Sequence, residues 1–364
     1  MPRTLKLSLT ALALLSLCAP AALARQGALD PQLEQAVTLY QKGDVKGALK
    51  EFRAAARRRP DDPLAWSYLG QALAQTGELK EARKALDAAL KIDPDYALAH
   101  SGLAYLHLVS GSEREAESEA AKALALDNGL KNAHYVLGLV RLRQGAWLKA
   151  LEEADAVIRL DAGHADAYSL KTQALVGLYE RASALLAEER RGAYDYDEAT
   201  IREARETLPL RLRQATESLS EYLRLRPGAE DAAEMREELE SMRFYAEAGA
   251  SADPARKVYS TREGIRRAEI LSKPEPGYTE EARRAGVSGI VRLRVVLGAD
   301  GRVRHVLPLR RLSHGLTEKA VEAARQIRFK PATLGGQPVS QYVVLEYGFN
   351  LLDRGAGRRR LGWD

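Results

Sequence analysis

The sequence has very few of the residues that build covalent or metal-based structure. Among its 364 residues Cys18 is the only cysteine, so the chain cannot form an internal disulfide or a cysteine metal cluster. Aromatic residues account for only 6%, which leaves small and aliphatic side chains to fill the core. The six histidines show no metal-ligand spacing, and G-x-S-x-G, Walker and H-E-x-x-H motifs are lacking. We therefore expect no enzyme activity, no cofactor and no metal site.

The N-terminal and C-terminal parts of the chain carry net charges of opposite sign. Thr261–Asp364 contains 20 basic and 11 acidic residues, whereas the preceding part contains 35 and 39. This asymmetry predicts separate domains in a soluble protein of this length. Up to about residue 250 the commonest residues are Ala, Leu, Glu and Arg, a composition that favours helices packed through small side chains.

The segment 1–24 has the organisation of a secretory signal peptide. A basic start is followed by an uncharged stretch, Leu7–Ala24, whose last three residues have the small-residue pattern of a cleavage site. The alternative is an uncleaved membrane anchor, but the stretch carries Pro20 and falls short of the about 20 apolar residues that a spanning helix needs. We therefore expect residues 1–24 to be removed and the mature chain to work outside the cytoplasm.

The segment 43–162 contains a regularly repeated pattern with a period of about 34 residues. Two helices cross closely only where side chains are small, so recurring Gly and Ala predict helical hairpins that pack through these positions. The glycines are Gly43, Gly77, Gly111 and Gly145, the alanines are Ala48, Ala82, Ala116 and Ala150, and the prolines that end the units are Pro60 and Pro94, with Asn128 and Ala162 at the later equivalents.

This pattern resembles the tetratricopeptide repeat (TPR). The resemblance implies antiparallel helix pairs that stack into a right-handed solenoid with a concave groove, because no single pair can bury its own apolar face. We expect the solenoid to span residues 29–248 as about five repeats, with an acidic, tyrosine-containing insertion near residues 190–200. A polar helix over residues 229–246 would cap the array.

The inner face of each first helix is expected to form the TPR groove. Its side chains are small, polar or aromatic, and we expect them to bind peptide segments of periplasmic proteins. Chaperone-binding members of the repeat family hold a C-terminal carboxylate with lysine and asparagine, and this sequence lacks that set. The expected groove residues are Ser67, Gln71, Ser101, Tyr105, Tyr135 and Leu139.

The period of the pattern changes from residue 271 onward. Apolar residues alternate with basic ones over 289–297, a Gly-Ala-Asp-Gly turn follows, and residues 302–306 return as a second strand. Residues 316–327 place their apolar side chains on one helical face, and residues 341–351 supply a third strand. The expected fold is therefore a helical TPR solenoid followed by a small α+β domain of a β-hairpin, a helix and a β-strand.

This second region resembles the TonB C-terminal domain over residues 271–351, with residues 249–270 as a linker and 352–364 as a basic tail. The resemblance rests on a proline-rich lead-in segment and on later motifs in the family order. One departure is Tyr278-Thr279, where the family usually has Tyr-Pro. The lead-in residues are Lys273, Pro274, Pro276 and Tyr278, and the later motifs are Asp300-Gly301-Arg302-Val303, Phe329-Lys330-Pro331-Ala332 and Gly336-Gln337-Pro338-Val339.

The resemblance implies contact with outer-membrane transport proteins by strand addition. The last strand would lie at a sheet edge, where unpaired N–H and C=O groups accept a short extended segment of the partner. The alternative is that the chain's own tail or a dimer mate covers this edge. The expected acceptor strand comprises Gln341, Tyr342, Val343, Val344, Leu345, Glu346 and Tyr347.

Together these features predict a non-catalytic, TonB-like protein of the cell envelope, located in the periplasm or, alternatively, anchored in the inner membrane. Its partners would be an outer-membrane transporter or other envelope proteins, and an energy-transducing role in transport is included in this prediction. The alternative function is a periplasmic structural adaptor without energy coupling. Nucleic acid is not expected as a partner despite the basic C-terminal balance, and membrane association is expected only if the N-terminal segment is uncleaved.

Overall fold

The computed structural model describes residues 30–41, 44–192, 196–247, 258–259 and 264–351. The expected signal segment, much of the expected linker and the basic tail lie outside these residues. The chain divides between Ala229 and Glu230 into an N-terminal and a C-terminal unit, and each is described by itself.

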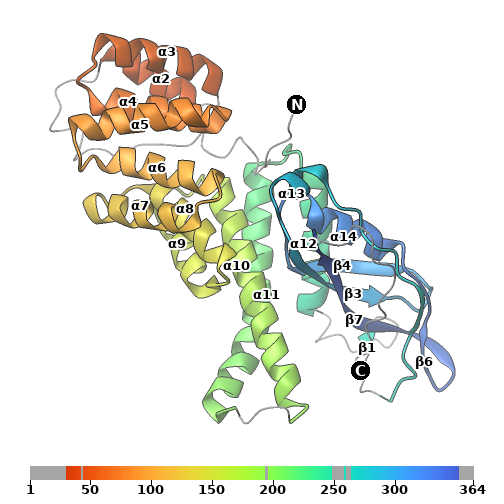
Figure 1. The fold of residues 1–364 in the computed structure, drawn as a ribbon. Coiled ribbons are helices and arrows are strands. Elements are labelled where there is room, and N and C mark those ends of the chain that lie inside the picture. The colour runs from red at the N-terminus through yellow and green to blue at the C-terminus, as the bar shows by residue number, and fades with distance from the viewer. Residues whose placement is uncertain (1–29, 42–43, 193–195, 248–257, 260–263, 352–364) are drawn as a thin grey trace. The chain divides into compact units, whose positions relative to one another are not determined.

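The N-terminal unit consists of five helix pairs in the described residues, stacked one after another (Figure 1). Contacts join the two helices of each pair, and they also join the first helices of successive pairs. The expected solenoid of helical hairpins is therefore confirmed. The pairs are α2 (Pro31–Gln41) with α3 (Val45–Arg58), α4 (Pro63–Thr76) with α5 (Leu79–Ile92), α6 (Ala97–Val109) with α7 (Glu113–Leu126), α8 (Lys131–Arg143) with α9 (Trp147–Leu160), and α10 (Ala165–Glu189) with α11 (Glu198–Leu225).

Small residues set the distance between the helices of a pair. A Cβ atom built on Gly70 of α4 would lie 2.5 Å from Cγ of Leu86 on α5, which is closer than any van der Waals contact allows. The four repeat alanines, one in each of the second helices α3, α5, α7 and α9, are fully buried. The turn glycines Gly77, Gly111 and Gly145 have φ between 71° and 84°, a conformation that favours glycine.

Ring side chains at one repeat position fix the turn that precedes each first helix. Trp66, His100, His134 and Tyr168 occupy this position in four successive repeats, and each contacts the backbone carbonyl six residues earlier at 3.0 to 3.3 Å. The two histidines contact a glutamate through their other ring nitrogen, at 2.6 and 2.7 Å. These two histidines therefore have a structural role at the junctions between repeats.

The last helix pair is longer than the others. The sequence predicted an insertion near residues 190–200, but the described part of that region lengthens both helices of the pair, so that α10 has 25 residues and α11 has 28. A separate small core of Leu186, Ile201 and Ala204 holds the extended ends together, with Tyr196 packed against it.

The C-terminal unit is built around an antiparallel pair, β3 (Gly289–Leu297) and β7 (Gln337–Phe349), in register from Gly289 opposite Phe349 to Leu297 opposite Gln341. The sheet has the order β1-β7-β3-β4, with β4 (Val303–Arg310) antiparallel to β3 and β1 (Val258–Tyr259) parallel to β7. The helix α14 (Leu316–Arg325) packs its buried residues against one face of this sheet. Further short elements are β2 (Glu269–Ser272), α13 (Glu280–Arg284), β5 (Arg328–Lys330) and β6 (Ala332–Leu334).

The expected hairpin, helix and strand of this unit are confirmed. The expected cap of the solenoid, over residues 229–246, is different. In the structure this segment contains the helix α12 (Ala232–Glu247). It contacts β4 instead, and it belongs to the C-terminal unit. Its buried residues Leu239, Met242 and Tyr245 form an apolar stripe that either core could bury, and the hydrogen bond from the Tyr245 hydroxyl to the His305 carbonyl fixes the stripe beside β4.

Gly70→Leu tests the close approach of the helices in the solenoid. The new side chain must displace Leu86, so we expect the free energy of unfolding to fall by roughly 1 to 3 kcal/mol or more. Gly228→Leu is the control, because a Cβ at this exposed glycine meets no atom within 4 Å. Urea denaturation of both variants gives the measurement, and equal stabilities would contradict the packing described.

Candidate functional site

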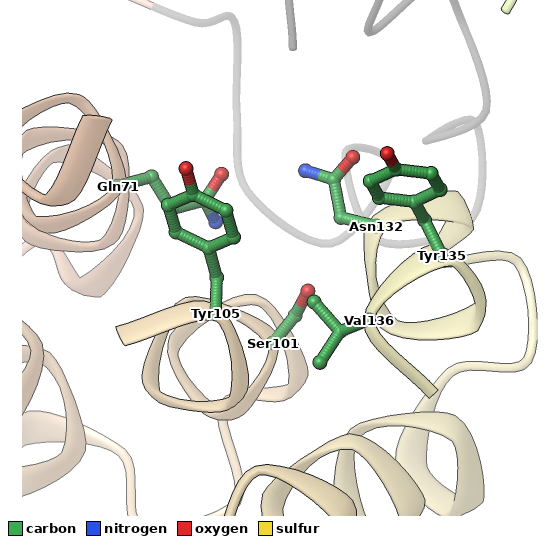
Figure 2. Close-up of a pocket in the computed structure, with 6 residues that line it drawn as sticks. All are labelled: Gln71, Ser101, Tyr105, Asn132, Tyr135 and Val136. Atoms are coloured by element: carbon green, nitrogen blue, oxygen red, sulfur yellow. The ribbon is translucent and has the colours of Figure 1, made fainter. Parts of the chain in front are cut away.

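The N-terminal unit contains a small pocket that spans three repeats, on the face where the sequence predicted a groove. It is lined by Gln71 of α4, Ser101 and Tyr105 of α6, and Asn132, Tyr135 and Val136 of α8 (Figure 2). All six residues lie on first helices of consecutive hairpins, which places them on one face of the stack. The cavity has about 10 Å³ of space, the least that holds one water molecule. It therefore fits a single polar group rather than a whole small-molecule ligand.

Three polar side chains of this pocket have buried atoms without a hydrogen-bond partner. They are Oε1 of Gln71, Oγ of Ser101 and Nδ2 of Asn132. The amide of Gln71 is held in place because its Nε2 donates to the Leu98 carbonyl at 3.2 Å. A buried polar atom without a partner costs about 1 to 3 kcal/mol. A ligand that supplies both donors and acceptors would recover this free energy.

The two tyrosines make the pocket aromatic and electrically neutral. Burial raises the pKa of Tyr105 to about 12, and burial with the nearby Asp166 raises the pKa of Tyr135 well above its ordinary value. Both hydroxyls are therefore protonated at neutral pH. The nearest charges are paired, since Asp166 lies 3.3 Å from Arg226 and Lys131 lies 2.6 Å from Asp161.

The structure brings together four of the six groove residues expected from the sequence. Ser67 is fully buried and donates to the Pro63 carbonyl of its own helix at 2.7 Å, and Leu139 packs in the core of the solenoid. Sequence reasoning missed Asn132 and Val136. Asn132 occupies a repeat position that holds leucine in both preceding repeats, so the change to an amide was the available signal.

In the described part of the C-terminal unit, one edge of β7 is largely without a strand neighbour. The sequence placed this strand at the sheet edge, but β1 pairs with Ser340 and Gln341, and β6 pairs with the start of β7. Gln341 is thus already engaged, and its buried side chain accepts a hydrogen bond from the Ala268 N–H at 2.8 Å. From Tyr342 onward, β3 is the only strand paired with β7 among the described residues.

Side chains of β7 alternate between the core and the other face of the sheet. Leu345 and Tyr347 are buried in the core that includes α14, and Val343 packs against it. Val344 is 46% exposed on the opposite face, where Glu346 also pairs with Arg292 at 3.0 Å. On the outer face of the sheet, this segment therefore presents the exposed Val344.

Lys273 of the lead-in segment contacts the edge of β7 that faces away from β3. Its Nζ donates to the Glu346 carbonyl at 2.6 Å and lies 4.4 Å from the centre of the Tyr347 ring, and its burial lowers the pKa of this lysine. Both backbone groups of one residue in an antiparallel strand point to the same side. The Glu346 contact therefore indicates that the backbone groups of Tyr342, Val344 and Glu346 face away from β3.

The rest of the lead-in segment packs against the start of β3 and the end of β7. Pro274 and Pro276 are half-buried. The Tyr278 hydroxyl donates to the Val287 carbonyl, and its ring contacts the Phe349 ring edge-on at 5.7 Å. Thr279, where the family usually has proline, is the N-cap of α13 and accepts a hydrogen bond from the Ala282 N–H.

The described residues contain neither a cluster of metal ligands nor a helix suited to crossing a membrane. None of their histidine, cysteine, aspartate and glutamate side chains form a group of three that could hold a metal ion. None of their helices combines the length and the apolar composition that crossing a membrane requires.

Comparison with known families identifies both units. Residues 33–97 and 80–131 match the tetratricopeptide repeat family, and residues 274–351 match the family of the Gram-negative bacterial TonB protein C-terminal domain. Both families consist of non-catalytic interaction domains. The chain thus combines tetratricopeptide repeats with a TonB C-terminal domain, which confirms both resemblances found in the sequence.

Comparison with solved structures returned several matches, of which two are described as TPR proteins. A thermophilic TPR protein of Thermus thermophilus is 18% identical, with 58% of this chain and 97% of that chain covered and a TM-score of 0.41. YrrB, described as a TPR protein with an unusual peptide-binding site, is 18% identical over 59% of this chain and 95% of its own, with a TM-score of 0.32. MamA is 21% identical over 52% and 96%, with a TM-score of 0.34. No curated protein matches the chain.

His164, at the start of α10, provides a pH test of the groove region. It is 3% exposed, caps its helix by accepting from the Ala167 N–H, and contacts the Tyr135 ring at 5.3 Å between ring centres. Burial, together with the charge of Lys131, lowers its pKa to about 4. Between this value and an unfolded pKa of about 6.5, the unfolded chain binds a proton that the folded chain does not. Stability should therefore fall as the pH is lowered through that window.

His164→Asn removes the titration and keeps an N-cap side chain. From pH 6.5 to pH 4, wild type should lose roughly 3 kcal/mol more stability than this variant. Urea denaturation at a series of pH values measures the difference. Parallel pH dependences of the two proteins would contradict the assignment of a neutral, buried His164.

Proposed function

We propose that this protein is a non-catalytic scaffold of the Gram-negative cell envelope that binds two kinds of protein segment. The C-terminal domain accepts an extended segment of an outer-membrane transport protein beside β7. The solenoid binds a second, uncharged peptide segment in its groove. The observation that carries the proposal is the edge of β7 over residues 343–347, where β3 is the only described strand paired with β7, in a domain that matches the TonB C-terminal family.

The geometry of the edge supports strand addition. Backbone groups that face away from β3 are those an added strand would use, and each hydrogen bond formed would contribute about 0.5 to 1.5 kcal/mol. Lys273 occupies one of these acceptors, the Glu346 carbonyl. An incoming strand would displace Lys273 from this carbonyl, or it would pair only with the part of β7 that precedes Glu346.

The groove pocket supports peptide binding by the solenoid. Gln71 and Asn132 each bring a side-chain amide, and an extended peptide backbone offers both the donor and the acceptor that their unpaired atoms lack. The neutral hydroxyls of Tyr105 and Tyr135 flank these amides. The pocket therefore favours an uncharged stretch of peptide over a terminal carboxylate.

Energy transduction to an outer-membrane transporter is the fuller form of this proposal. Force can be transmitted only by a chain anchored in the inner membrane, and the segment that decides this, residues 1–24, lies outside the described residues. If that segment is cleaved, the protein is a periplasmic adaptor without energy coupling. Both forms use the same two binding surfaces.

Val344→Pro tests strand addition at β7. Proline removes the N–H that faces away from β3 and places its ring in the path of an added strand, whereas Val344→Ala keeps the N–H. We expect Val344→Pro to weaken capture of detergent-solubilised outer-membrane proteins by about tenfold, and Val344→Ala to leave it within about twofold of wild type.

The readout is photo-crosslinking from a probe that replaces Glu346 in the mature chain, followed by mass spectrometry of the crosslinked peptides. Circular dichroism establishes that both variants are folded. A folded Val344→Pro protein that crosslinks the same partner segments as Val344→Ala would rule out strand addition at this edge.

Ser101→Ala tests the groove pocket, with Ser67→Ala as the matched control one repeat earlier. Ser101 has no hydrogen-bond partner, so its loss should leave stability unchanged or slightly raised and weaken peptide binding by roughly 2- to 13-fold. Ser67 bonds within its own helix and lies outside the pocket, so its loss should lower stability without changing binding. Peptides selected from a random display library on the mature chain serve as probes. If Ser101→Ala and Ser67→Ala bind the selected peptides equally well, the pocket is not the site where these peptides bind.

A further inference from the structure

The pocket of the solenoid has more groups that donate hydrogen bonds than groups that can only accept them. Ser101, Tyr105 and Tyr135 present hydroxyls, and Nδ2 of Asn132 is a donor without a partner. Among the described atoms that line the pocket, Oε1 of Gln71 is the unpaired one that can only accept. The occupant that fits this set therefore brings several carbonyl oxygens and few N–H groups.

The cavity itself has room for one carbonyl oxygen. Its space of about 10 Å³ holds an atom group of the size of a water molecule. Ser101 and Asn132 are only 1% and 8% exposed, and a carbonyl oxygen, with its two lone pairs, can accept from both. Figure 2 shows the rings of Tyr105 and Tyr135 on opposite sides, with Ser101 between them. The rest of a ligand held in this way would lie against the two aromatic rings.

Aromatic donors continue from the pocket toward the N-terminal repeats. Tyr68 of α4 occupies, two repeats earlier, the position of Val136 in the pocket. Its ring stacks on Phe52 with 5.4 Å between centres, and Phe52 contacts Tyr40 of α2 edge-on at 5.8 Å. The buried hydroxyl of Tyr40 has no partner. Burial raises the pKa of Tyr40, and the nearby Tyr105 and Tyr68 raise it further, so the three hydroxyls gather on the first helices.

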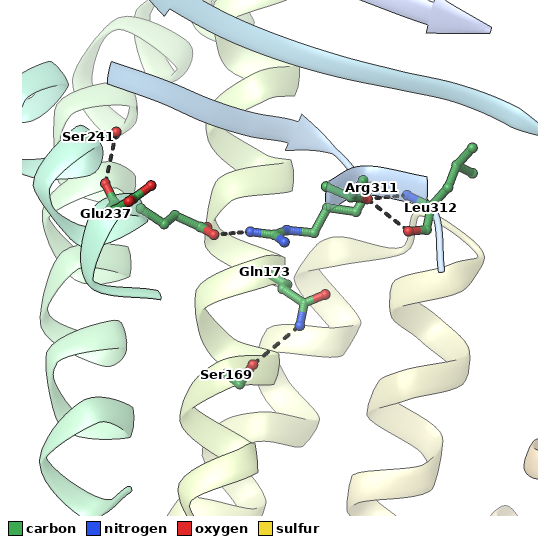
Figure 3. Close-up of polar contacts among 8 residues, drawn as sticks. Ser169, Gln173, Glu237, Ser241, Arg311 and Leu312 are labelled. Carbon is green, nitrogen blue, oxygen red and sulfur yellow. Dashed lines mark hydrogen bonds and ion pairs between the residues drawn. The ribbon is translucent and has the colours of Figure 1, made fainter. Parts of the chain in front are cut away.

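On α10 the corresponding polar side chains are already engaged. Gln173 occupies the repeat position of Gln71, three repeats later, but its amide donates to Ser169 of the same helix at 3.4 Å (Figure 3). Asp166, near the start of this helix, pairs with Arg226 at 3.3 Å. The surface with unpaired polar atoms therefore runs from α8 toward α2.

We propose that this surface binds a proline-rich peptide segment in the polyproline II conformation, with single non-proline residues between the prolines. Proline brings a carbonyl but no N–H, and grooves lined by aromatic side chains recognise such segments. A non-proline residue supplies the N–H that Oε1 of Gln71 lacks. The conformation is preformed, so the peptide loses little entropy on binding. This inference rests on the proposed function, because it names the class of peptide that the pocket binds.

The pitch of polyproline II matches the spacing of the repeats. One turn of three residues advances about 9 Å, and packed helices lie about 8 to 10 Å apart. In the solenoid α4 contacts α6, and α6 contacts α8. Carbonyls three residues apart would therefore reach equivalent points on successive first helices. In a β-strand the repeat is two residues and about 7 Å, which falls out of step with the helices.

Two synthetic, uncharged peptides test the class of ligand on the mature chain. One repeats Ala-Pro-Pro for four turns, about 12 residues. The other repeats Ala-Ser-Ser over the same length, which restores the N–H groups and removes the rings. We expect the proline peptide to bind about tenfold more tightly, because the N–H groups of the serine peptide find too few acceptors. Isothermal titration calorimetry at low and high salt measures both, and the affinity should not change with salt.

Tyr105→Leu tests the aromatic wall of the pocket. We expect it to weaken binding of the proline peptide by roughly 2- to 13-fold, since the ring contact is lost. Tyr105→Phe keeps the ring and should lose less. Leu148→Ala, at an exposed position of the second helix α9, is the control and should bind as wild type does. Circular dichroism establishes folding, and if Tyr105→Leu unfolds, Tyr105→Phe and Ser101→Ala carry the test.

Equal affinities for the two peptides, both weakened by Ser101→Ala, would overturn the preference for proline and leave peptide binding at the pocket intact. Tight binding of the proline peptide that none of the folded pocket variants weakens would place it elsewhere and would also overturn the proposal. So would a failure of the mature chain to bind the proline peptide. Peptides selected from the random library would still report independently on whether the pocket binds peptides at all.

Discussion

The close approach of helices at small residues is the constraint on which the pocket of the solenoid depends. Leu86 sits where any side chain on Gly70 would be, and buried alanines recur at the matching positions of the second helices. This spacing keeps consecutive first helices side by side, so that Gln71, Ser101 and Asn132 from three hairpins meet in one pocket. A bulkier residue at a crossing would separate the helices and with them the amides of the pocket.

Both units contain polar groups that remain available for hydrogen bonds with a ligand. In the solenoid, these are side-chain atoms that are buried without partners, and in the C-terminal domain they are backbone groups along the second half of β7. Each is expensive or hazardous in an isolated protein, because unpaired groups destabilise the fold or attract unwanted strands. At β4, the helix α12 contacts the strand, and the Tyr245 hydroxyl donates to the His305 carbonyl.

Much of the fold could be predicted because its signals are local and periodic. The constant spacing of the repeat glycines and alanines located the helix pairs, and the alternation over residues 289–297 located β3. Long-range choices were not predictable in the same way. The apolar stripe of α12 shows that the helix is buried but does not show against which core, and β1 is defined only by its pairing with Ser340 and Gln341. The lengthening of α10 and α11 was read as an insertion because it breaks the repeat register.

The central claim is that the edge of β7 receives a strand from an envelope partner. The most direct measurement is hydrogen exchange of the mature chain with and without a detergent-solubilised outer-membrane fraction, followed at the amides of Val344 and Glu346. These amides should become protected when the partner is added, while the amides of β4 stay unchanged. Unchanged exchange along β7 in a sample where binding is established by co-sedimentation would contradict the account.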